Sequence, residues 1–353
     1  MDVTLMASHV PFLAIRPDDQ FSPDIVKDDP GSNSDTAMDS LRKLPLAVRF
    51  PLACFLSLSL SSALYSIVAS TAGVELASVS RDLQDPWTIG ALVAWKTSGV
   101  AVAWYAGYDY QDLISLNFLA NLPYYYLLNT FYSIHDVACI TALVIDITST
   151  AIPFALLRSV IHAHKSSEAK TPNQEVAQDK FVYGLLSLFG AAITSLVVYG
   201  SFYTWLPTYM VVHFDGLRSV EKAHNSALYV LVALFIPIGA ATTHFVFAPA
   251  VGSPGNPGLT DPKLKKTAIN PETATLRETI AWNLGCGPDG WTKRAEILFA
   301  RTASLTACAC INTFVRVYVT IEGTEIVGAV GWASVWGVAT TLTGLAFAWV
   351  GNE

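Results

Sequence analysis

Charged residues are scarce in this chain of 353 residues. Asp, Glu, Lys and Arg make up 14% of it, whereas soluble domains usually carry about a quarter. Hydrophobic residues make up 52%, and the mean hydropathy is +0.42. Most of the remaining charge lies outside the long apolar stretches, so the composition excludes an ordinary soluble domain and indicates a membrane protein.

Several functional signatures are also missing. The net charge is −7 and no nucleic-acid-binding motif is present, so nucleic acid is not an expected partner. The five cysteines form no CxxC pair, and we expect neither a metal site nor a cofactor. The first residues lack the charged-then-apolar order of a cleaved signal peptide. No glycosylation sequon is present to indicate the compartment.

Eight apolar stretches fill the chain from about Leu46 to its C-terminus, and each is long enough to cross a bilayer. Backbone polar groups in lipid must be paired within the segment, so each stretch is predicted to be a helix. A single helix over 113–158 would overshoot the bilayer, and we divide it at Ser133–Asp136. The predicted spans are 50–73, 89–107, 113–133, 137–158, 181–205, 227–250, 296–319 and 326–350. The predicted fold class is therefore all-α, a polytopic transmembrane bundle of about eight spans.

The distribution of lysine and arginine predicts the orientation of these spans. With a cytoplasmic N-terminus, thirteen of these residues fall on the cytoplasmic side and three on the other. An even number of spans puts both termini in the cytoplasm. Residues 1–44 are predicted to be a disordered polar tail, and 45–353 a transmembrane domain with a long cytoplasmic loop at 251–294. We expect a multi-pass protein of the endoplasmic reticulum.

Ionisable side chains inside spans are candidates for function, because each costs roughly 3 kcal/mol or more in lipid. Asp146 lies near the middle of the fourth span, Lys96 inside the second, and Arg316 near the lumenal end of the seventh. Asn312, Arg316 and Thr320 are spaced four residues apart and share one helix face. Together with nearby tyrosines, these residues predict an aromatic-lined cavity that opens toward the lumenal leaflet.

Such a cavity suits carbocation chemistry. A carboxylic acid out of water favours its protonated form and can protonate an olefin or an epoxide, and aromatic faces attract the cation that forms. Asp146 is the expected proton donor, and if Lys96 neutralises it, Asp136 or Glu322 is the better acid. The predicted catalytic residues are Asp146, Asp136, Glu322, His135 and Arg316, and the predicted substrate-binding residues are Lys96, Asn121, Tyr125, Tyr132 and Asn312.

The same residues also have structural interpretations. Lys96 and Asp146 are candidates for an ion pair that holds two helices together, and a cation beside Asp146 would keep it ionised. Arg316 is close enough to a helix end to extend to the interface, and Glu322 fits an ordinary loop acid. The functional prediction therefore depends on the concentration of polar groups on one side of the membrane.

Several C-terminal segments resemble a known family. The segments are Gly255–Pro262, Pro271–Leu276, Asn312–Phe314, Thr320–Gly323, Gly328-Ala329, Val335-Trp336, Thr343-Gly344 and Trp349–Gly351. Together they resemble the fungal membrane-bound terpene cyclases of the ascofuranone and macrophorin pathways, and the related membrane protein of paxilline-type indole-diterpene clusters. The resemblance covers about the C-terminal third.

The resemblance implies a metal-independent terpene cyclase, an isomerase or lyase of meroterpenoid or indole-diterpene secondary metabolism. It implies a hydrophobic prenylated small-molecule substrate and functional coupling to a prenyltransferase and an epoxidase. Membrane lipid is the other expected partner. The family assigns no roles residue by residue, so the candidate site residues depend on burial and charge alone.

Three other functions compete with this one. A prenyltransferase-like cyclase would hold Mg²⁺ and diphosphate with Asp-rich motifs, and the one such motif near a span is Asp109–Asp112. A retinal protein would need a lysine in the middle of the last spans, and the seventh and eighth have none. A non-catalytic transporter or accessory membrane protein of the same pathway remains the main alternative, although Pro153 and Pro237 do not occupy matched positions.

Overall fold

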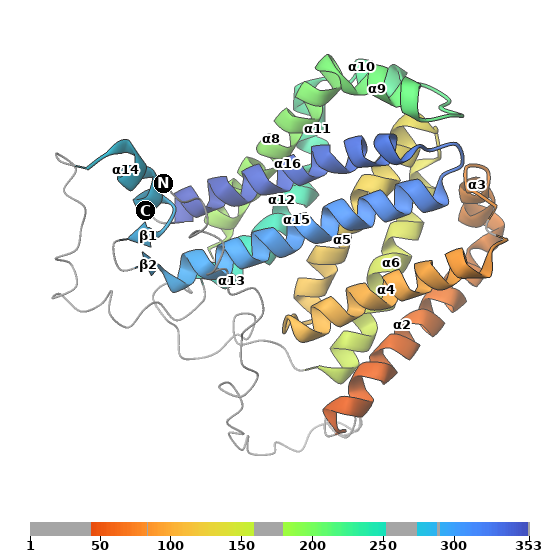
Figure 1. The fold of residues 1–353 in the computed structure, drawn as a ribbon, viewed down its shortest axis with the longest axis horizontal. Helices are drawn as coiled ribbons and strands as arrows, with labels where there is room; N and C mark the ends of the chain where they lie inside the picture. Colours follow the sequence, from red (N-terminus) through yellow and green to blue (C-terminus); the bar gives the residue numbers. More distant parts are fainter. Residues whose placement is uncertain (1–43, 83, 159–178, 252–273, 288–289, 352–353) are drawn as a thin grey trace, which may run out of the picture.

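The computed structural model describes residues 44–82, 84–158, 179–251, 274–287 and 290–351, and these are almost entirely helical (Figure 1). The predicted all-helical bundle is therefore confirmed. The predicted tail falls almost wholly outside the described residues, as does much of the predicted loop at 251–294. The long helices are α2 (Leu46–Ile67), α4 (Pro86–Tyr105), α5 (Tyr110–Phe131), α6 (Asp136–Leu157), α8 (Lys180–Thr204), α15 (Lys293–Thr320) and α16 (Ile326–Gly351).

Shorter elements connect these helices. They are the π-helical turn η3 (Ala69–Gly73), α3 (Val74–Ala77), α9 (Leu206–His213), α10 (Glu221–His224), α11 (Leu228–Leu234), α12 (Ile236–Thr242), the π-helical turn η5 (Thr243–Phe247), α13 (Ala248–Val251) and α14 (Leu276–Asn283). Within the described ranges, the strands are β1 (Cys286–Gly287) and β2 (Gly290–Trp291), which pair antiparallel.

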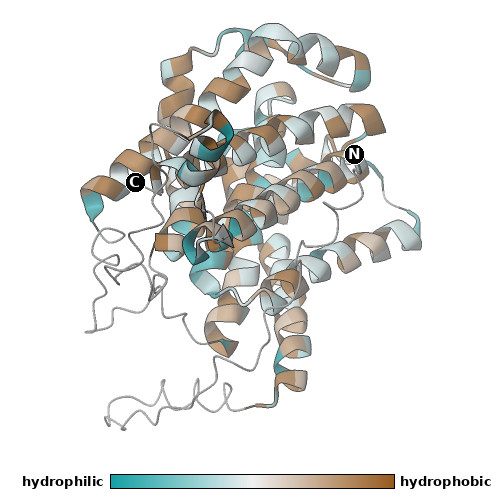
Figure 2. Cartoon of the chain, turned by 60° about the vertical axis from the view of Figure 1, so that its left-hand side comes forward, coloured by the Kyte–Doolittle hydropathy of each residue, from teal (hydrophilic) through white to brown (hydrophobic). Residues whose placement is uncertain are grey.

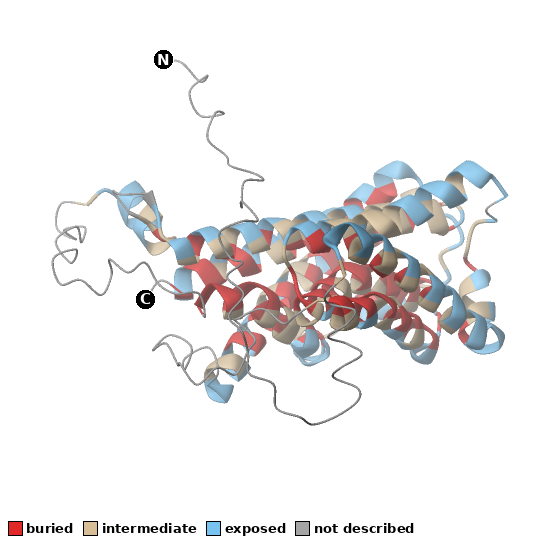
Figure 3. Ribbon diagram, turned by 90° about the horizontal axis from the view of Figure 1, so that it is seen from below, coloured by how far each residue is buried: buried red, intermediate tan, exposed pale blue. Residues whose placement is uncertain are grey.

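Helix α5 lies inside the bundle and contacts α6, α12 and α15. Its inward side chains Leu127, Leu128 and Phe131 are fully buried. Tyr126 packs edge-on against Phe235 of the segment between α11 and α12, at a centroid distance of 5.4 Å. Figure 3 shows the buried residues concentrated along the middle of the bundle, with exposed residues on its outer surfaces. The core is therefore built around α5.

The chain between α5 and α6 breaks where the sequence predicts. Helix α5 ends at Phe131 and α6 begins at Asp136, so the predicted division of 113–158 is confirmed. Ser133 has a positive φ of 54°, the backbone conformation that lets the chain reverse direction. A second break separates α11 from α12–α13, which are bent by 49°. Pro237 lies in the first turn of α12, where its missing N–H breaks the continuous ladder of helical bonds.

The turn between α15 and α16 is held from both sides at one end of the bundle. The Glu322 N–H donates to the Val79 carbonyl at 3.1 Å, and the Asp215 N–H donates to the Gly323 carbonyl at 2.9 Å. Gly323 has a φ of +70°, and a Cβ there would come within 2.5 Å of Asp215, so this position requires glycine. We call this end, with residues 75–81, 132–136, 213–222 and 321–325, the loop end.

Many large hydrophobic residues of the helices are exposed, and hydrophobic residues, brown in Figure 2, recur along the helices. Five described helices are long and apolar enough to cross a membrane: α2, α6, α8, α15 and α16. The bent α11–α13 pair would make a sixth span. Helices α4 and α5 do not reach the same hydropathy, so the eight spans predicted from the sequence are not confirmed. Several described helices are thus long and apolar enough to span a membrane, which is consistent with a membrane protein.

Helices α8 and α12 approach each other closely enough to bring their backbones into contact. A Cβ added at Gly239 of α12 would collide with the Ser187 carbonyl oxygen and lie 2.7 Å from the Ala191 backbone nitrogen of α8. Backbone atoms of a packed helix have no room to move aside. Small residues at such crossings are typical of membrane helices, because association in lipid depends on close packing.

Replacing Gly239 with alanine is expected to destabilise the protein by about 1–3 kcal/mol, the usual cost of overpacking. Gly184→Ala is the matched control, since it lies in α8 with no atom within 4 Å of the added Cβ. Alanine favours helix at both positions, so any loss at Gly239 reports the helix contact. Thermal unfolding in detergent measures both variants, and an unchanged midpoint for Gly239→Ala would contradict the close crossing.

Candidate functional site

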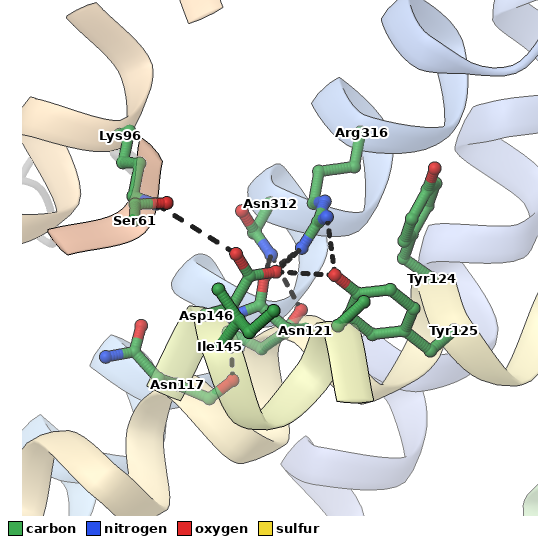
Figure 4. Close-up of polar contacts among 12 residues, drawn as sticks. Ser61, Lys96, Asn117, Asn121, Tyr124, Tyr125, Ile145, Asp146, Asn312 and Arg316 are labelled. Atoms are coloured by element: carbon green, nitrogen blue, oxygen red, sulfur yellow. Dashed lines mark hydrogen bonds and ion pairs between the residues drawn. The ribbon is translucent and has the colours of Figure 1, made fainter. Parts of the chain in front are cut away.

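Asp146 of α6 lies in the interior of the bundle, with its side chain 12% exposed. Its Oδ2 atom accepts hydrogen bonds from Arg316 Nη1 at 2.6 Å and from the Tyr125 hydroxyl at 2.7 Å. Its Oδ1 atom accepts a hydrogen bond from the Tyr65 hydroxyl at 3.2 Å and lies 4.0 Å from Lys96 Nζ. Figure 4 shows the carboxylate with Lys96 on one side and Arg316 and Tyr125 on the other.

Helix α15 presents one polar face to this carboxylate. Asn312 donates to the Asn121 Oδ1 atom at 2.9 Å, and Arg316 donates to the same atom at 2.6 Å. Thr320 donates to the Tyr124 hydroxyl at 3.0 Å. The prediction that Asn312, Arg316 and Thr320 share a face is confirmed, and that face is directed at α5 and α6.

The Arg316 guanidinium also lies against two aromatic rings. Its Cζ atom is 4.4 Å from the centroid of Tyr124 and 4.9 Å from that of Tyr125. The ring faces attract the cation, and the Tyr125 hydroxyl accepts a hydrogen bond from Nη2 at 3.0 Å. Arg316 is therefore held within the bundle by these contacts.

Lys96 of α4 is the outermost member of the cluster, with its side chain 28% exposed. Its Nζ donates to the Ser61 hydroxyl of α2 at 2.5 Å. We call Ser61, Tyr65, Lys96, Asn121, Tyr125, Asp146, Asn312 and Arg316 the polar cluster; it joins α2, α4, α5, α6 and α15. The cluster holds two cations and one carboxylate.

This geometry leaves Asp146 engaged on both oxygens. A carboxylate offers about four acceptor positions, and here an arginine and two tyrosines donate to it while a lysine lies nearby. Asp146 could remain a protonated, neutral acid only if no cation lay beside it. Arg316 and Lys96 supply two, so the arrangement is that of an ion pair between helices.

The other predicted acids lie away from Asp146, at the loop end. Asp136 and Glu322 are exposed. Asp136 accepts a hydrogen bond from the Asn129 side chain. The ring of His135 pairs with Glu75 at 3.0 Å.

The structure therefore divides the predicted site residues into two groups. Asp146, Arg316, Lys96, Asn121, Tyr125 and Asn312 meet in the polar cluster, whereas Asp136, Glu322, His135 and Tyr132 belong to the loop end. Tyr132 is buried there, with its hydroxyl 3.5 Å from the Asp215 carbonyl oxygen.

A second ion pair joins α5 and α15 nearer the start of both helices. Arg301 donates to both carboxylate oxygens of Asp112, at 2.6 and 3.0 Å, and also to the Phe245 carbonyl at 2.8 Å. Asp112 is completely buried, and the Arg301 Cζ atom lies 5.2 Å from the centroid of Tyr108. The sequence analysis missed this pair. The spacing of the two arginines along α15, about four turns apart, was the available signal.

The pairing of Asp112 also argues against the diphosphate motif at Asp109–Asp112. Asp109 caps α5 by accepting the Asp112 N–H at 2.9 Å, and the Asp112 carboxylate is bound by arginine. Among the described residues, no group of three His, Cys, Asp or Glu side chains is placed to hold a metal ion. An open depression of about 350 Å³ lies on the loop end beside Phe214–Val220, away from the polar cluster.

Replacing Asp146 with asparagine is expected to destabilise the protein by about 3–5 kcal/mol, because it leaves two buried cations without a carboxylate. Lys96→Met is the matched control. This change leaves the Asp146–Arg316 ion pair, whose net charge is zero, intact. It is expected to change stability by less than about 1 kcal/mol. Thermal unfolding in detergent measures both changes.

The double variant Asp146→Asn/Arg316→Met tests the pairing itself. Directly bonded residues are expected to give a coupling free energy of about 0.5–3 kcal/mol, so the double variant should lose less stability than the sum of the single variants. Additive losses would show that the two side chains do not act as a pair.

The comparison with known proteins gives one match. Residues 179–350 match the family model of the Bouquet formation protein 3 C-terminal domain. No curated protein and no solved structure matches the chain. The matched segment runs from the residue before α8 through nearly all of α16, and so includes Arg301, Asn312 and Arg316.

This match overturns the resemblance to terpene cyclases. The C-terminal segments that suggested that family, from Asn312 to the end of α16, lie almost wholly inside the region matched by the Bouquet formation protein 3 model. The predicted cyclase activity and its place in meroterpenoid or indole-diterpene biosynthesis are therefore wrong. The transporter or pathway-accessory alternative also lacks support, because it depended on the same pathway. Small residues such as glycine and threonine are common at helix contacts in membrane proteins generally, so short runs of them do not identify a family.

Proposed function

We propose that this chain is a membrane-embedded structural protein that acts in formation of the meiotic bouquet. The match of residues 179–350 to the Bouquet formation protein 3 C-terminal domain carries the proposal. The matched segment contributes α15 and α16, which lie side by side in the bundle (Figure 1).

The polar cluster supports a structural role rather than a catalytic one. Its hydrogen bonds join α15, from the matched segment, to α5 and α6, which precede it. Both carboxylate oxygens of Asp146 already accept hydrogen bonds from side chains of the protein. A buried pair of this kind fixes which helices meet and in what register, a role for which buried polar groups are known.

We also propose that α4 and α5 cross the membrane, which would give eight spans with both termini on the cytoplasmic side. Helix α5 contacts α6, α12 and α15, and a helix enclosed by protein needs less hydropathy than one that faces lipid. The connections of α2 to α4, α5 to α6 and α15 to α16 all lie at the loop end, and the few lysines and arginines there fit the lumenal side.

Membrane lipid is the partner that this architecture needs, because exposed apolar side chains line α2, α8 and α16. We propose the endoplasmic reticulum membrane as the location; the charge distribution supports only the orientation of the spans within the membrane. The prenylated substrate, the prenyltransferase and the epoxidase were inferred only through the cyclase resemblance, and no observation in the structure supports them.

Cells that lack the chain are expected to form the bouquet in a smaller fraction of meiotic cells than cells that carry it. Microscopy of meiotic cells measures this fraction, and reintroducing the wild-type chain should restore it. Lys96→Met should restore it equally, because that change leaves the Asp146–Arg316 pair in place. Normal bouquet formation in the absence of the chain would refute the proposal.

A structural role also predicts how the Asp146 variants behave. Bouquet formation with Asp146→Asn/Arg316→Met should follow the amount of folded protein, since no chemical step depends on either side chain. Immunoblots of the membrane fraction give that amount. A well-folded double variant with no activity would instead indicate chemistry at the cluster.

Glycosylation sequons inserted singly in three connections test the crossings by α4 and α5. Sequons in the α2–α4 and α5–α6 connections should be glycosylated, whereas one in the α4–α5 turn near Gly107 should not, because only the first two would face the lumen. A mobility shift on gels reports each modification. Three identical results would show that α4 and α5 do not cross.

A further inference from the structure

Aromatic side chains from the ends of three helices, α2, α4 and α6, pack together at the end of the bundle opposite the loop end. Phe50 of α2 packs against Trp104 and Tyr105, the last two residues of α4, at centroid distances of 6.0 and 5.7 Å. Trp104 packs edge-on against Phe154 of α6 at 5.5 Å. Tryptophan and tyrosine at helix ends are typical of the boundary between lipid chains and headgroups.

Two arginines lie at this end of the bundle. Arg158, one residue beyond α6, donates from Nη1 to the Trp104 carbonyl at 2.8 Å, and its Cζ atom lies 5.5 Å from the centroid of the Trp104 ring. Arg49 lies next to Phe50 in the first turn of α2. Its Nε is buried and has no hydrogen-bond partner among the residues that the structure describes. Arg158 is therefore fixed by a hydrogen bond to the backbone, whereas the Nε donor of Arg49 is available to a ligand.

The two arginines lie within electrostatic reach of each other. Burial lowers the pKa of Arg158, and the positive charge of Arg49 lowers it further, whereas the carboxylates of Asp109 and Asp112 oppose these effects. The N-terminal end of α2 adds positive potential, because its N-cap is Pro45, with no side-chain acceptor, and its first turn has no acidic residue. An anion between these groups would relieve the repulsion.

We propose that Arg49 and Arg158 bind the phosphate of an anionic phospholipid at the joint ends of α2, α4 and α6. Guanidinium groups bind phosphate oxygens through paired hydrogen bonds, and a basic pocket between membrane helices is suited to a lipid headgroup. The site is independent of any role in bouquet formation, since it depends only on insertion of these helices in a bilayer.

The surroundings favour a lipid over a free anion. Tyr105, the last residue of α4, is largely exposed, and Phe55 of α2 and Val102 of α4 also present exposed apolar surface. Acyl chains would cover that surface while the headgroup lies on the arginines. A free phosphate would gain only the polar contacts.

Thermal unfolding of the full chain in detergent, with phosphatidylserine or phosphatidylcholine added in series, tests the site. Wild-type protein should be stabilised at lower concentrations of phosphatidylserine than of phosphatidylcholine. Arg49→Gln should weaken apparent phosphatidylserine binding by about tenfold, as expected for loss of one charge-assisted contact. This variant breaks no hydrogen bond within the described part of the protein, so it should fold, and its unfolding midpoint without lipid checks this.

Arg81→Gln is the matched control, because Arg81 also lies over an aromatic ring, Tyr318 at 5.7 Å, but at the loop end. It should bind phosphatidylserine as the wild type does. The site would be overturned if both variants lost phosphatidylserine binding equally, or if Arg49→Gln bound phosphatidylserine as tightly as the wild type. Inorganic phosphate that stabilises the protein as well as phosphatidylserine does would overturn the assignment to a lipid, and a phosphate effect much weaker than that of the lipid supports it.

Discussion

The ion pair between Asp146 and Arg316 is the interaction on which the arrangement of the helices depends. It connects α6 to α15, and its neighbours Tyr65, Lys96 and Asn121 bring α2, α4 and α5 to the same point. In lipid, apolar side chains gain nothing by leaving one apolar neighbour for another, so association between helices depends on packing and polar contacts. A buried charge that fails to meet its partner would cost several kcal/mol. The pair therefore strongly disfavours alternative packings of these helices.

Both internal ion pairs join the same two parts of the chain. The carboxylates, Asp112 and Asp146, come from helices before residue 179, and the arginines, Arg301 and Arg316, come from the segment that matches the Bouquet formation protein 3 C-terminal domain. Each of the two arginines thus pairs with a carboxylate from the other part of the chain. The matched domain and the preceding helices are thus expected to fold as one unit in this chain.

Close packing of small residues complements these charges. Gly239 lets α12 touch the backbone of α8, and Gly344 of α16 faces Thr302 of α15 so closely that a Cβ there would overlap the threonine side chain. Such contacts are made within the matched segment, whereas the ion pairs connect it to the rest. Packing and charge therefore act at different interfaces of one bundle, and a change at either is expected to appear first as lost stability.

The helical content, the membrane character, the break near Ser133 and the shared face of Asn312, Arg316 and Thr320 follow from periodicity and hydropathy, which are local properties of the sequence. The sequence also marked Asp146, Lys96 and Arg316 as unusual, because ionisable groups are costly in lipid wherever they point. It could not decide whether Asp146 faces a cavity or an arginine, because that depends on which helices become neighbours. Only the tertiary structure brings α15 beside α5 and α6, and this contact turns a candidate acid into one half of an ion pair.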